Sequence, residues 1–491
     1  MTLEAAPAWR PVPPSVGWIL LALAHLSLAG IAIGLWSPVA FPLALTLAAV
    51  ALYFAMAPDD VVLGIGMALL YANAGAVAVT VHGVPAIAAV GVLGLVAWPL
   101  VRAFFDGRPL GPATMPASVP WVVGYLLVMV ASSFGAQDRE AAADAVLTFL
   151  MEGLPLYLLM IAVVQTPGRL RRVLWVLLAA GAGVATLSVV QALTGDYGQD
   201  FLGFARTSEA ELARLSTDLF GRFDPPRAGG PIGEKNFFAQ MLTVLVPVGL
   251  VLATTTRSVP RRLLALGATA VVLGGIAATG SRGAAVALVL VVVVMVATGD
   301  LRPRHALVGA VVVVALLAAF PSYGERLTAL ATASTDGAET TLDDPAVLGR
   351  ASSMLGSLRV FSDNPVLGVG PDNYGLHHRD AAIEVGLKVV EGREPHSLLL
   401  GLAAETGLLG LVAFCGVLAV TAVGLVRARR QARRRAPDEA PLYGALLYVL
   451  VAWFASGIFL HLAYERYFWT WIGLSSAAAA IGTRGGGRAR S

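Results

Sequence analysis

The sequence predicts an all-α integral membrane protein that crosses the bilayer about fourteen times. Hydrophobic residues make up 57% of the 491 residues and charged residues only 13%, whereas soluble globular domains carry about 25% charged residues. Apolar stretches close to the roughly 20 residues that a spanning helix requires recur along the chain. Arginines gather in alternate connections between these stretches. Lipid is therefore the expected solvent for most of the chain.

The apolar stretches also define the expected domain organisation. Fourteen spans are expected, at about 17–36, 38–57, 61–81, 85–105, 119–134, 145–165, 170–193, 233–254, 260–279, 283–298, 304–320, 397–426, 441–461 and 464–482. They form an N-terminal bundle, a central group that carries arginine motifs and a C-terminal group, separated by two long polar loops. The predicted boundaries are 1–16 (lead), 17–193, 194–232 (loop), 233–320, 321–396 (large loop), 397–482 and 483–491 (tail).

Arginine placement predicts the orientation, because short cytoplasmic loops retain Lys and Arg. Numbering from an N-terminus inside the cell, every second connection contains arginine, except the turn at residues 58–60. The strongest of these clusters, Arg427–Arg435, is interpreted as a cytoplasmic topology determinant that could also contact anionic lipid. Both termini are therefore predicted to be cytoplasmic, and the two long loops, 194–232 and 321–396, external.

Positive charge on the external side has no topological explanation, so it favours a functional role. The cations and histidines predicted to face outward are Arg206, Arg214, Arg222, Arg227, Lys235, Arg282, Arg350, Arg359, His377, His378, Arg393 and His396. Several of the loop arginines could instead pair with neighbouring carboxylates. Within the large loop, residues 348–361 have helical spacing of apolar residues, and Asn364-Pro365 should end that helix. An amphipathic helix across the outer mouth is expected.

Three of the outward cations are candidates for binding an anion. Arg227 and Lys235 flank a glycine-rich turn just before a spanning helix, and Arg282 begins another one. The backbone N–H groups of a helix N-terminus bind anions, and guanidinium groups bind phosphate oxygens in a bidentate manner. A phosphate-bearing ligand at the membrane surface fits this pattern. Asn236 and Arg350 are further candidate binding residues, as are His377 and His378.

His396 is the candidate catalytic residue. It stands at the end of the large loop, where a hydrophobic helix begins, and a neutral imidazole can accept a proton from a hydroxyl group. Glu405 should lie deep in the same helix, where an ionisable group is costly. Either a functional role or a structural pairing explains Glu405, and both stay open.

Other chemistry has little support in the sequence. No GxxxxGK[ST] phosphate loop for ATP is present. The single cysteine, Cys415, excludes an internal disulfide and a cysteine-based metal site. Asp343 and Asp344 lie in a loop without neighbouring histidines. No metal, cofactor or nucleic-acid partner is expected.

Four motifs in this order resemble those of the O-antigen ligase superfamily. His396-Ser397, nine residues and then GLLG at 407–410 resemble its histidine motif, and NPVLGVG at 364–370 resembles its Pro-x-x-Gly-x-Gly element. TGSRG at 279–283 and the stretch from Arg227 to Asn236 resemble its two arginine elements. Glu234-Lys235-Asn236 departs from the Asp-Pro-Asn-like turn of many members.

The resemblance implies a GT-C-type glycosyltransferase of the bacterial inner membrane, with its active site on the external face. The reaction it implies is metal-independent transfer of a glycan, with inversion, from an undecaprenyl-pyrophosphate carrier to an acceptor hydroxyl. His396 would activate the acceptor, and Arg227, Arg282 and Lys235 would bind the pyrophosphate. The acceptor could be a glycolipid, as in a ligase, a growing glycan, as in a repeat-unit polymerase, or a protein, as in a protein O-oligosaccharyltransferase. Transport of a lipid-linked sugar is the alternative of a different class.

Overall fold

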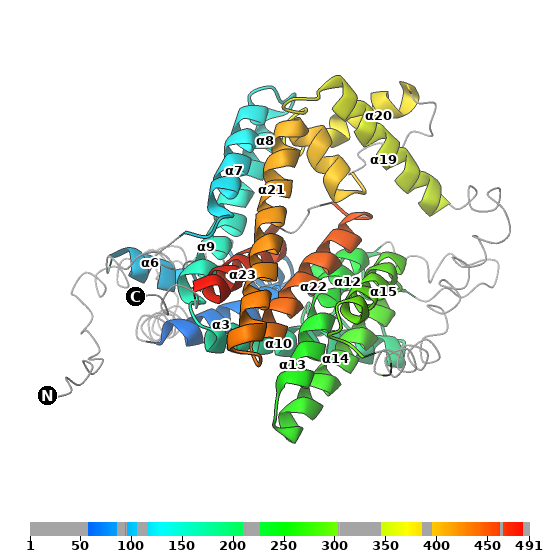
Figure 1. The fold of residues 1–491 in the computed structure, drawn as a ribbon. Coiled ribbons are helices and arrows are strands. Elements are labelled where there is room, and N and C mark those ends of the chain that lie inside the picture. Colours follow the sequence, from blue (N-terminus) through cyan, green and yellow to red (C-terminus); the bar gives the residue numbers. More distant parts are fainter. Residues whose placement is uncertain are drawn as a thin grey trace, which may run out of the picture.

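The computed structural model describes residues 57–85, 96–105, 115–209, 226–302, 345–384, 395–461 and 465–484, together with the single residues 94, 212 and 304. Helices dominate these segments, and no strand occurs within them. In Figure 1, long helices form a bundle, and two helices of the large loop lie at its upper end. The fold class predicted from composition, a helical membrane protein, is therefore confirmed.

The first half of the described chain is built from consecutive helices with short connections. Their bounds are α3 (Asp59–Tyr71), α4 (Ala74–Thr80), α6 (Trp98–Phe105), α7 (Val119–Ser133), α8 (Arg139–Thr148), the π-helical turn η1 (Phe149–Gly153), α9 (Leu154–Val163) and α10 (Pro167–Thr194).

The second half contains the segments that carry the four motifs. Its elements are the 3-10 turn η2 (Gly230–Ile232), α12 (Lys235–Thr243), α13 (Leu245–Thr255), α14 (Val259–Thr279), α15 (Arg282–Ala297), α19 (Pro345–Asp363), α20 (Tyr374–Glu384), α21 (Leu398–Arg435), α22 (Ala440–Gly457) and α23 (Glu465–Arg484).

Within the described segments, six helical stretches are long and apolar enough to cross a membrane. They are 139–163, 167–194, 235–255, 259–279, 398–435 and 440–457, and the bent pair α3–α4 would make a seventh. The apolar helices α7 and α15 are shorter, with 15 and 16 residues. The predicted span 17–36 lies outside the described residues, as do 304–320 except residue 304, nearly all of 38–57 and about half of 85–105.

Segments predicted to share one side of the membrane do come together. Arg171, Arg257, Arg261 and Asp438, all from predicted cytoplasmic connections, line one pocket. Arg257 Nη2 and Asp438 Oδ2 lie 3.1 Å apart there. Several segments predicted to be external meet at the other end of the bundle, as described below. Three connections that the arginine pattern predicts to share one side therefore lie together in the described structure.

Local sequence signals explain where several helices begin and end. The Asp138 carboxylate accepts hydrogen bonds from the backbone N–H groups of Glu140 and Ala141 (both 3.0 Å), and so caps α8. Thr166 caps α10, with Pro167 in its first turn. Gly195 and Gly280 follow the ends of α10 and α14 in the left-handed conformation that glycine adopts without strain.

An aromatic cluster lies where α7, α21 and α23 pack together. Trp469 is fully buried, and its ring meets those of Phe149 (4.9 Å between centroids), Phe468 (5.3 Å) and Tyr125 (6.0 Å). Phe414 stacks on Phe468 at 5.2 Å. Large rings bury much apolar area and favour edge-to-face contact. This cluster fixes α21 against the C-terminal helix.

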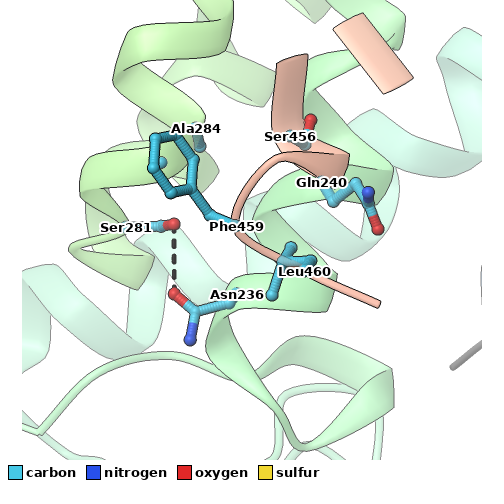
Figure 2. A pocket seen from close by; sticks show the side chains of 8 residues that line it. Asn236, Gln240, Ser281, Ala284, Ser456, Phe459 and Leu460 are labelled. Carbon is cyan, nitrogen blue, oxygen red and sulfur yellow. Dashed lines mark hydrogen bonds between the residues drawn. The ribbon is translucent and has the colours of Figure 1, made fainter. Parts of the chain in front are cut away.

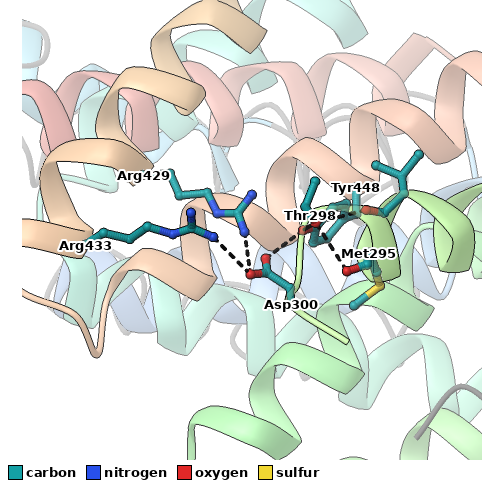
Figure 3. Close-up of polar contacts among 7 residues, drawn as sticks. Met295, Thr298, Asp300, Arg429, Arg433 and Tyr448 are labelled. Carbon is teal, nitrogen blue, oxygen red and sulfur yellow. Dashed lines mark hydrogen bonds and ion pairs between the residues drawn. The ribbon is translucent and has the colours of Figure 1, made fainter. Parts of the chain in front are cut away.

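A buried polar network ties α15, α21 and α22 together at the end that contains the arginine-rich connections (Figure 3). Asp300 pairs with Arg429, which is only 8% exposed, and with Arg433 at 3.4 Å. Tyr448 donates a hydrogen bond to Asp300 at 2.6 Å. A buried guanidinium requires such a partner. Arg429, predicted to serve mainly topology, is therefore also part of the packed structure.

The helix predicted at 397–426 differs from a single span, because α21 is broken at Gly407 (φ 64°, ψ −166°). The segment 398–406 is a short helix, and the long one runs from residue 408 to Arg435. Leu398 packs against Gly457 at the end of α22. Figure 1 shows the short segment, in lighter orange, rising beside α19 to meet the top of the long helix. Residues 398–435 thus form an inverted V with its apex at Gly407.

The helix predicted at residues 348–361 is observed within α19, and it ends at Asp363 just before Asn364-Pro365, as expected. α19 packs against α20. Arg359 Nε donates to Glu384 Oε2 at 2.8 Å and Arg359 Nη1 lies 3.3 Å from Asp363 Oδ1. The hydrogen bond with Glu384 is the main cause that raises the pKa of Arg359. A small separate core, which includes Val360, Val369 and Tyr374, holds α19 and α20 to the apex segment.

Candidate active site

The first arginine element forms a tight, hydrogen-bonded turn immediately before α12. Gly233 N donates to Gly229 O at 2.9 Å, and Arg206 pairs through its backbone with both Gly229 and Gly230 (2.9 Å each). Gly230 has φ +56°, and a Cβ there would lie 2.5 Å from the Phe238 ring. Only glycine fits this turn. The backbone that carries Arg227 is therefore held rigidly against α12.

Glu234 caps α12 and explains the departure from the Asp-Pro-Asn-like turn. Its Oε2 accepts the backbone N–H groups of Asn236 and Phe237 (2.8 Å each), and its Oε1 accepts the Asn236 side-chain amide (3.1 Å). A shorter acidic residue would provide the same cap. Lys235 occupies the first helical position, where proline is also favoured. The cap at the start of α12 is thus retained despite the different sequence, and Lys235 adds a positive charge there.

The second arginine element is the turn between α14 and α15. Ser281 belongs to neither helix. Its backbone N–H donates to Thr279 Oγ1 at 3.2 Å, and α15 begins at the next residue, Arg282. The Ser281 hydroxyl donates to Asn236 Oδ1 at 3.2 Å (Figure 2). The N-termini of α12 and α15 therefore lie side by side.

A second contact joins the two elements. Ala228 N, next to Arg227, donates to Ala278 O near the end of α14 at 3.1 Å. The structure thus brings Arg227, Lys235, Asn236 and Arg282 into one neighbourhood, in which Arg227, Lys235 and Arg282 are half-buried. Three cations in one place, against the single capping carboxylate of Glu234, give this neighbourhood a net positive charge, and the N-terminus of α15 adds to its attraction for an anion.

A small pocket opens beside this region. Figure 2 shows it between the starts of α12 and α15 and the turn that follows α22. Its lining residues are Asn236, Gln240, Ser281, Gly283, Ala284, Ser456, Phe459 and Leu460. His461, in the same turn, packs edge-on against Phe237 with 5.2 Å between ring centroids. The turn after α22 is therefore part of the site.

His396 lies half-buried at the start of the short arm of α21. Its backbone N–H donates to Ser353 Oγ on α19 at 3.1 Å. Two residues later, Leu398 contacts Gly457 at the end of α22, next to Ser456, which lines the pocket. His396 is thus connected to the arginine region through the end of α22.

His378 lies in the contact between α19 and α20, and it is linked to the His396 backbone through Tyr374 and Ser353. It is fully buried, and its Nδ1 lies 2.8 Å from the Tyr374 hydroxyl, which in turn donates to Ser353 O at 2.8 Å. A Cβ on Gly356 would lie 2.9 Å from His378 Nδ1, so the two helices pack closely there. This chain of contacts supports the residue that holds the His396 backbone. His377, on the same helix, is half-buried.

Glu405 is placed differently from the prediction. It belongs to the short arm next to the apex, and not to the interior of a continuous span. Its backbone carbonyl accepts hydrogen bonds from Gly370 N (2.9 Å) and from the Ser132 hydroxyl (2.8 Å). Arg350 lies in α19, and its side chain is outside the described part of the structure.

The glycines of the Pro-x-x-Gly-x-Gly element lock the apex. Val369 N donates to Ala404 O at 3.0 Å, and Leu408 N donates to Pro365 O at 2.8 Å. A Cβ on Gly368 would lie 2.4 Å from the Glu405 backbone, and one on Gly407 would lie 2.2 Å from the Val366 carbonyl oxygen. The broken helix ends thus find hydrogen-bond partners, as buried backbone polar groups require. These glycines position the short arm that begins after His396.

One polar cluster near the site was not predicted. Arg466 Nη1 donates to the Glu152 carboxylate (3.2 and 3.3 Å), and Arg466 Nη2 donates to Asn73 Oδ1 (2.8 Å). An available signal was that Glu152 and Asn73 both fall inside predicted apolar spans, where polar groups are costly. Among the residues that the structure describes, no group of three His, Cys, Asp or Glu side chains could hold a metal ion.

Comparison with known proteins agrees with the motifs. Residues 267–415 match the family described as O-antigen ligase. The match includes the turn with Arg282, the Pro-x-x-Gly-x-Gly element, His396 and the apex at Gly407. No curated protein matches the chain. Residues 267–415 are therefore similar to the O-antigen ligase family, which supports the resemblance that the histidine and arginine motifs predicted.

Proposed function

We propose that the protein transfers a glycan from an undecaprenyl-pyrophosphate carrier to an acceptor hydroxyl at the outer face of the bacterial inner membrane, as an O-antigen ligase does. The observation that carries this proposal is the Asn236–Ser281 hydrogen bond, which joins the two arginine elements beside the turn that contacts the histidine segment. The family match supports a ligase or polymerase type of membrane enzyme. The same proposal includes a GT-C-like fold with fourteen membrane-spanning helices and both termini in the cytoplasm.

The pyrophosphate is assigned to the N-termini of α12 and α15. There Arg227, Lys235 and Arg282 neutralise the charge that develops on the leaving phosphate as the glycosidic bond breaks. Guanidinium groups can hold two phosphate oxygens at once. The N-terminus of α15 adds a fixed dipole that favours the same anion. These cations take the part that a metal ion plays in other glycosyltransferases.

The acceptor hydroxyl is assigned to His396. The imidazole takes the hydroxyl proton while the acceptor oxygen forms a bond to the anomeric carbon of the donor sugar. The bond between that carbon and the pyrophosphate oxygen breaks on the opposite face, and the carrier pyrophosphate leaves with the electron pair. Attack opposite the leaving group inverts the anomeric centre. Tyr374, His378 and Ser353 hold the backbone of the base.

The test is deletion of the gene in its host, followed by gel analysis of lipopolysaccharide and of free polysaccharide. A ligase deletion removes long glycan from the lipid and leaves carrier-linked polymer. Loss of the polymer itself, with single repeats remaining, assigns the repeat-unit polymerase activity instead. Loss of glycan from proteins alone assigns protein O-glycosylation. Unchanged glycans of all three kinds, with labelled carrier accumulating on one face of the membrane, contradict transferase activity and favour transport.

A further inference from the structure

The loop of the first arginine element is tied to a polar cluster made by three segments far apart in sequence. Asn73 Nδ2 donates to Pro231 O at 2.9 Å, and Pro231 lies in the 3-10 turn between Arg227 and Lys235. Asn73 Oδ1 accepts from Arg466 Nη2, and Arg466 Nη1 pairs with Glu152. An unbroken chain of polar contacts thus runs from Glu152 through Arg466 and Asn73 to the phosphate-binding turn.

Two members of this chain stand at irregular points of their helices, and the third stands at a helix start. Asn73 is 6% exposed and left-handed (φ 51°) at the break between α3 and α4, which are bent by 50°. Glu152 lies in the π-helical turn η1, and such turns often mark functional sites. Arg466 lies in the first turn of α23. Breaks and charged groups inside apolar spans are costly, so their coincidence calls for a role.

The guanidinium geometry explains why arginine is needed at this point. Its planar fork donates to the Glu152 carboxylate through one nitrogen and to the Asn73 carbonyl oxygen through another. With its oxygen engaged, the Asn73 amide is oriented so that its nitrogen points to Pro231. Tyr467 and Trp471 of α23 also bond to the end of α3, at Leu70 O (3.2 Å) and Tyr71 Oη (2.7 Å). The start of α23 therefore fixes the break in which Asn73 sits.

We infer that Arg466 and Asn73 are positioning residues of the donor site, which hold the Arg227–Lys235 turn at the distance that binding of the carrier pyrophosphate requires. Glu152 keeps the Arg466 guanidinium in place. This inference rests on the proposed function for the identity of the anion. None of the three touches the reacting atoms.

The experiment measures two quantities on the purified full-length protein in lipid nanodiscs: the Kd for undecaprenyl pyrophosphate, and the donor KM and kcat of glycan transfer. Asn73→Ala is expected to raise Kd and KM about tenfold, because a displaced cation turn loses a charge-assisted contact. Arg466→Lys keeps a charge beside Glu152 but lacks the fork, and is expected to raise them by a similar factor. The two changes combined should raise them no further, since both break the same chain.

Two variants separate positioning from general stability. Glu152→Met combined with Arg466→Met replaces the ion pair with apolar side chains, which preserves folding in many proteins. It should leave the thermal midpoint near that of the wild type and still raise Kd. Tyr448→Phe removes a hydrogen bond from the Asp300 network at the other end of the bundle and should leave Kd and KM unchanged.

Wild-type Kd and KM in Asn73→Ala and Arg466→Lys overturn the inference, as does an equal rise in Tyr448→Phe. A wild-type protein that binds the carrier but transfers no glycan overturns the proposed function alone, because Kd still reports the positioning effect. A wild-type protein that does not bind the carrier overturns both.

Discussion

The backbone N–H of Gly370 donates a hydrogen bond to the carbonyl oxygen of Glu405 at 2.9 Å. Two motifs recognised separately in the sequence are thus one structural unit: the Pro-x-x-Gly-x-Gly loop closes the apex of the broken α21. Val369 and Leu408 add bonds in opposite directions across the same junction. The glycines of both motifs allow this approach of backbone to backbone.

Gly407→Ala should destabilise the protein and reduce transfer. The Gly407 conformation costs a residue with a Cβ about 1–3 kcal/mol, and the added atom would also meet the Val366 carbonyl oxygen. Thermal unfolding in detergent and a transfer assay measure both effects. Gly183→Ala in α10 is the matched control, because a Cβ there meets open space. It should be neutral or slightly stabilising. Equal behaviour of the two variants would contradict the assigned role of the apex.

His396→Ala should reduce kcat of glycan transfer by at least about 10²-fold, because the acceptor hydroxyl loses its proton acceptor. Carrier binding should be unaffected. His82→Ala, a change at an exposed histidine bonded to Leu202 O, should retain activity close to that of the wild type. Full activity of the His396 variant at normal membrane levels would remove His396 from the mechanism.

Arg282→Ala should reduce kcat by about 10²–10³-fold and weaken carrier binding, since a fixed charge at the leaving pyrophosphate is lost. Arg282→Lys should recover part of the loss, because it restores charge without bidentate geometry. The control is Arg261→Ala, at an exposed arginine of the opposite end. Unchanged donor kinetics in Arg282→Ala would show that this arginine serves structure.

Asp300→Ala should destabilise the protein by about 3–5 kcal/mol, because Arg429 is left buried without its carboxylate. The double variant Asp300→Leu, Arg429→Met should recover most of this loss. Thermal unfolding provides the measurement, and the donor KM of the surviving folded protein should stay constant. A stable single variant would show that water or another group compensates the guanidinium.

Transfer should persist after extensive treatment with EDTA, and added Mg²⁺ or Mn²⁺ should not increase its rate, because the proposed neutralisation of pyrophosphate rests on Arg227, Lys235 and Arg282. The check is the initial rate of transfer from a purified lipid-linked donor, with and without chelator. A rate that collapses in EDTA and returns with one added cation would contradict this assignment.

The sequence predicted the elements whose signals are local. Hydropathy and proline placed α14, α19 and α22 within a few residues of their observed bounds. The glycines beside Arg227, Lys235 and Arg282 indicated candidate anion-binding positions, and the family resemblance predicted that the three share one site; the Asn236–Ser281 contact is consistent with that prediction.

The features that depend on distant contacts were not predicted. Hydropathy continues smoothly through Gly407, and the break there is stabilised by residues 365–370 from another part of the chain. Asn73 is likewise held in its break by Arg466, 393 positions away in sequence. The spacing of residues within one segment carries no information about partners from distant segments. The inverted V and the Asn73 cluster could therefore be found only from the structure.

The short arm of α21 acts as a spacer of fixed length. Its upper end is anchored at the apex, and its lower end begins two residues after His396. Each residue added to or removed from the arm would move the imidazole by about 1.5 Å along the helix axis and turn it by about 100°. The nine residues between His396-Ser397 and Gly407 therefore set the position of His396 relative to the apex, and a substitution in the arm should be tolerated far better than a change in its length.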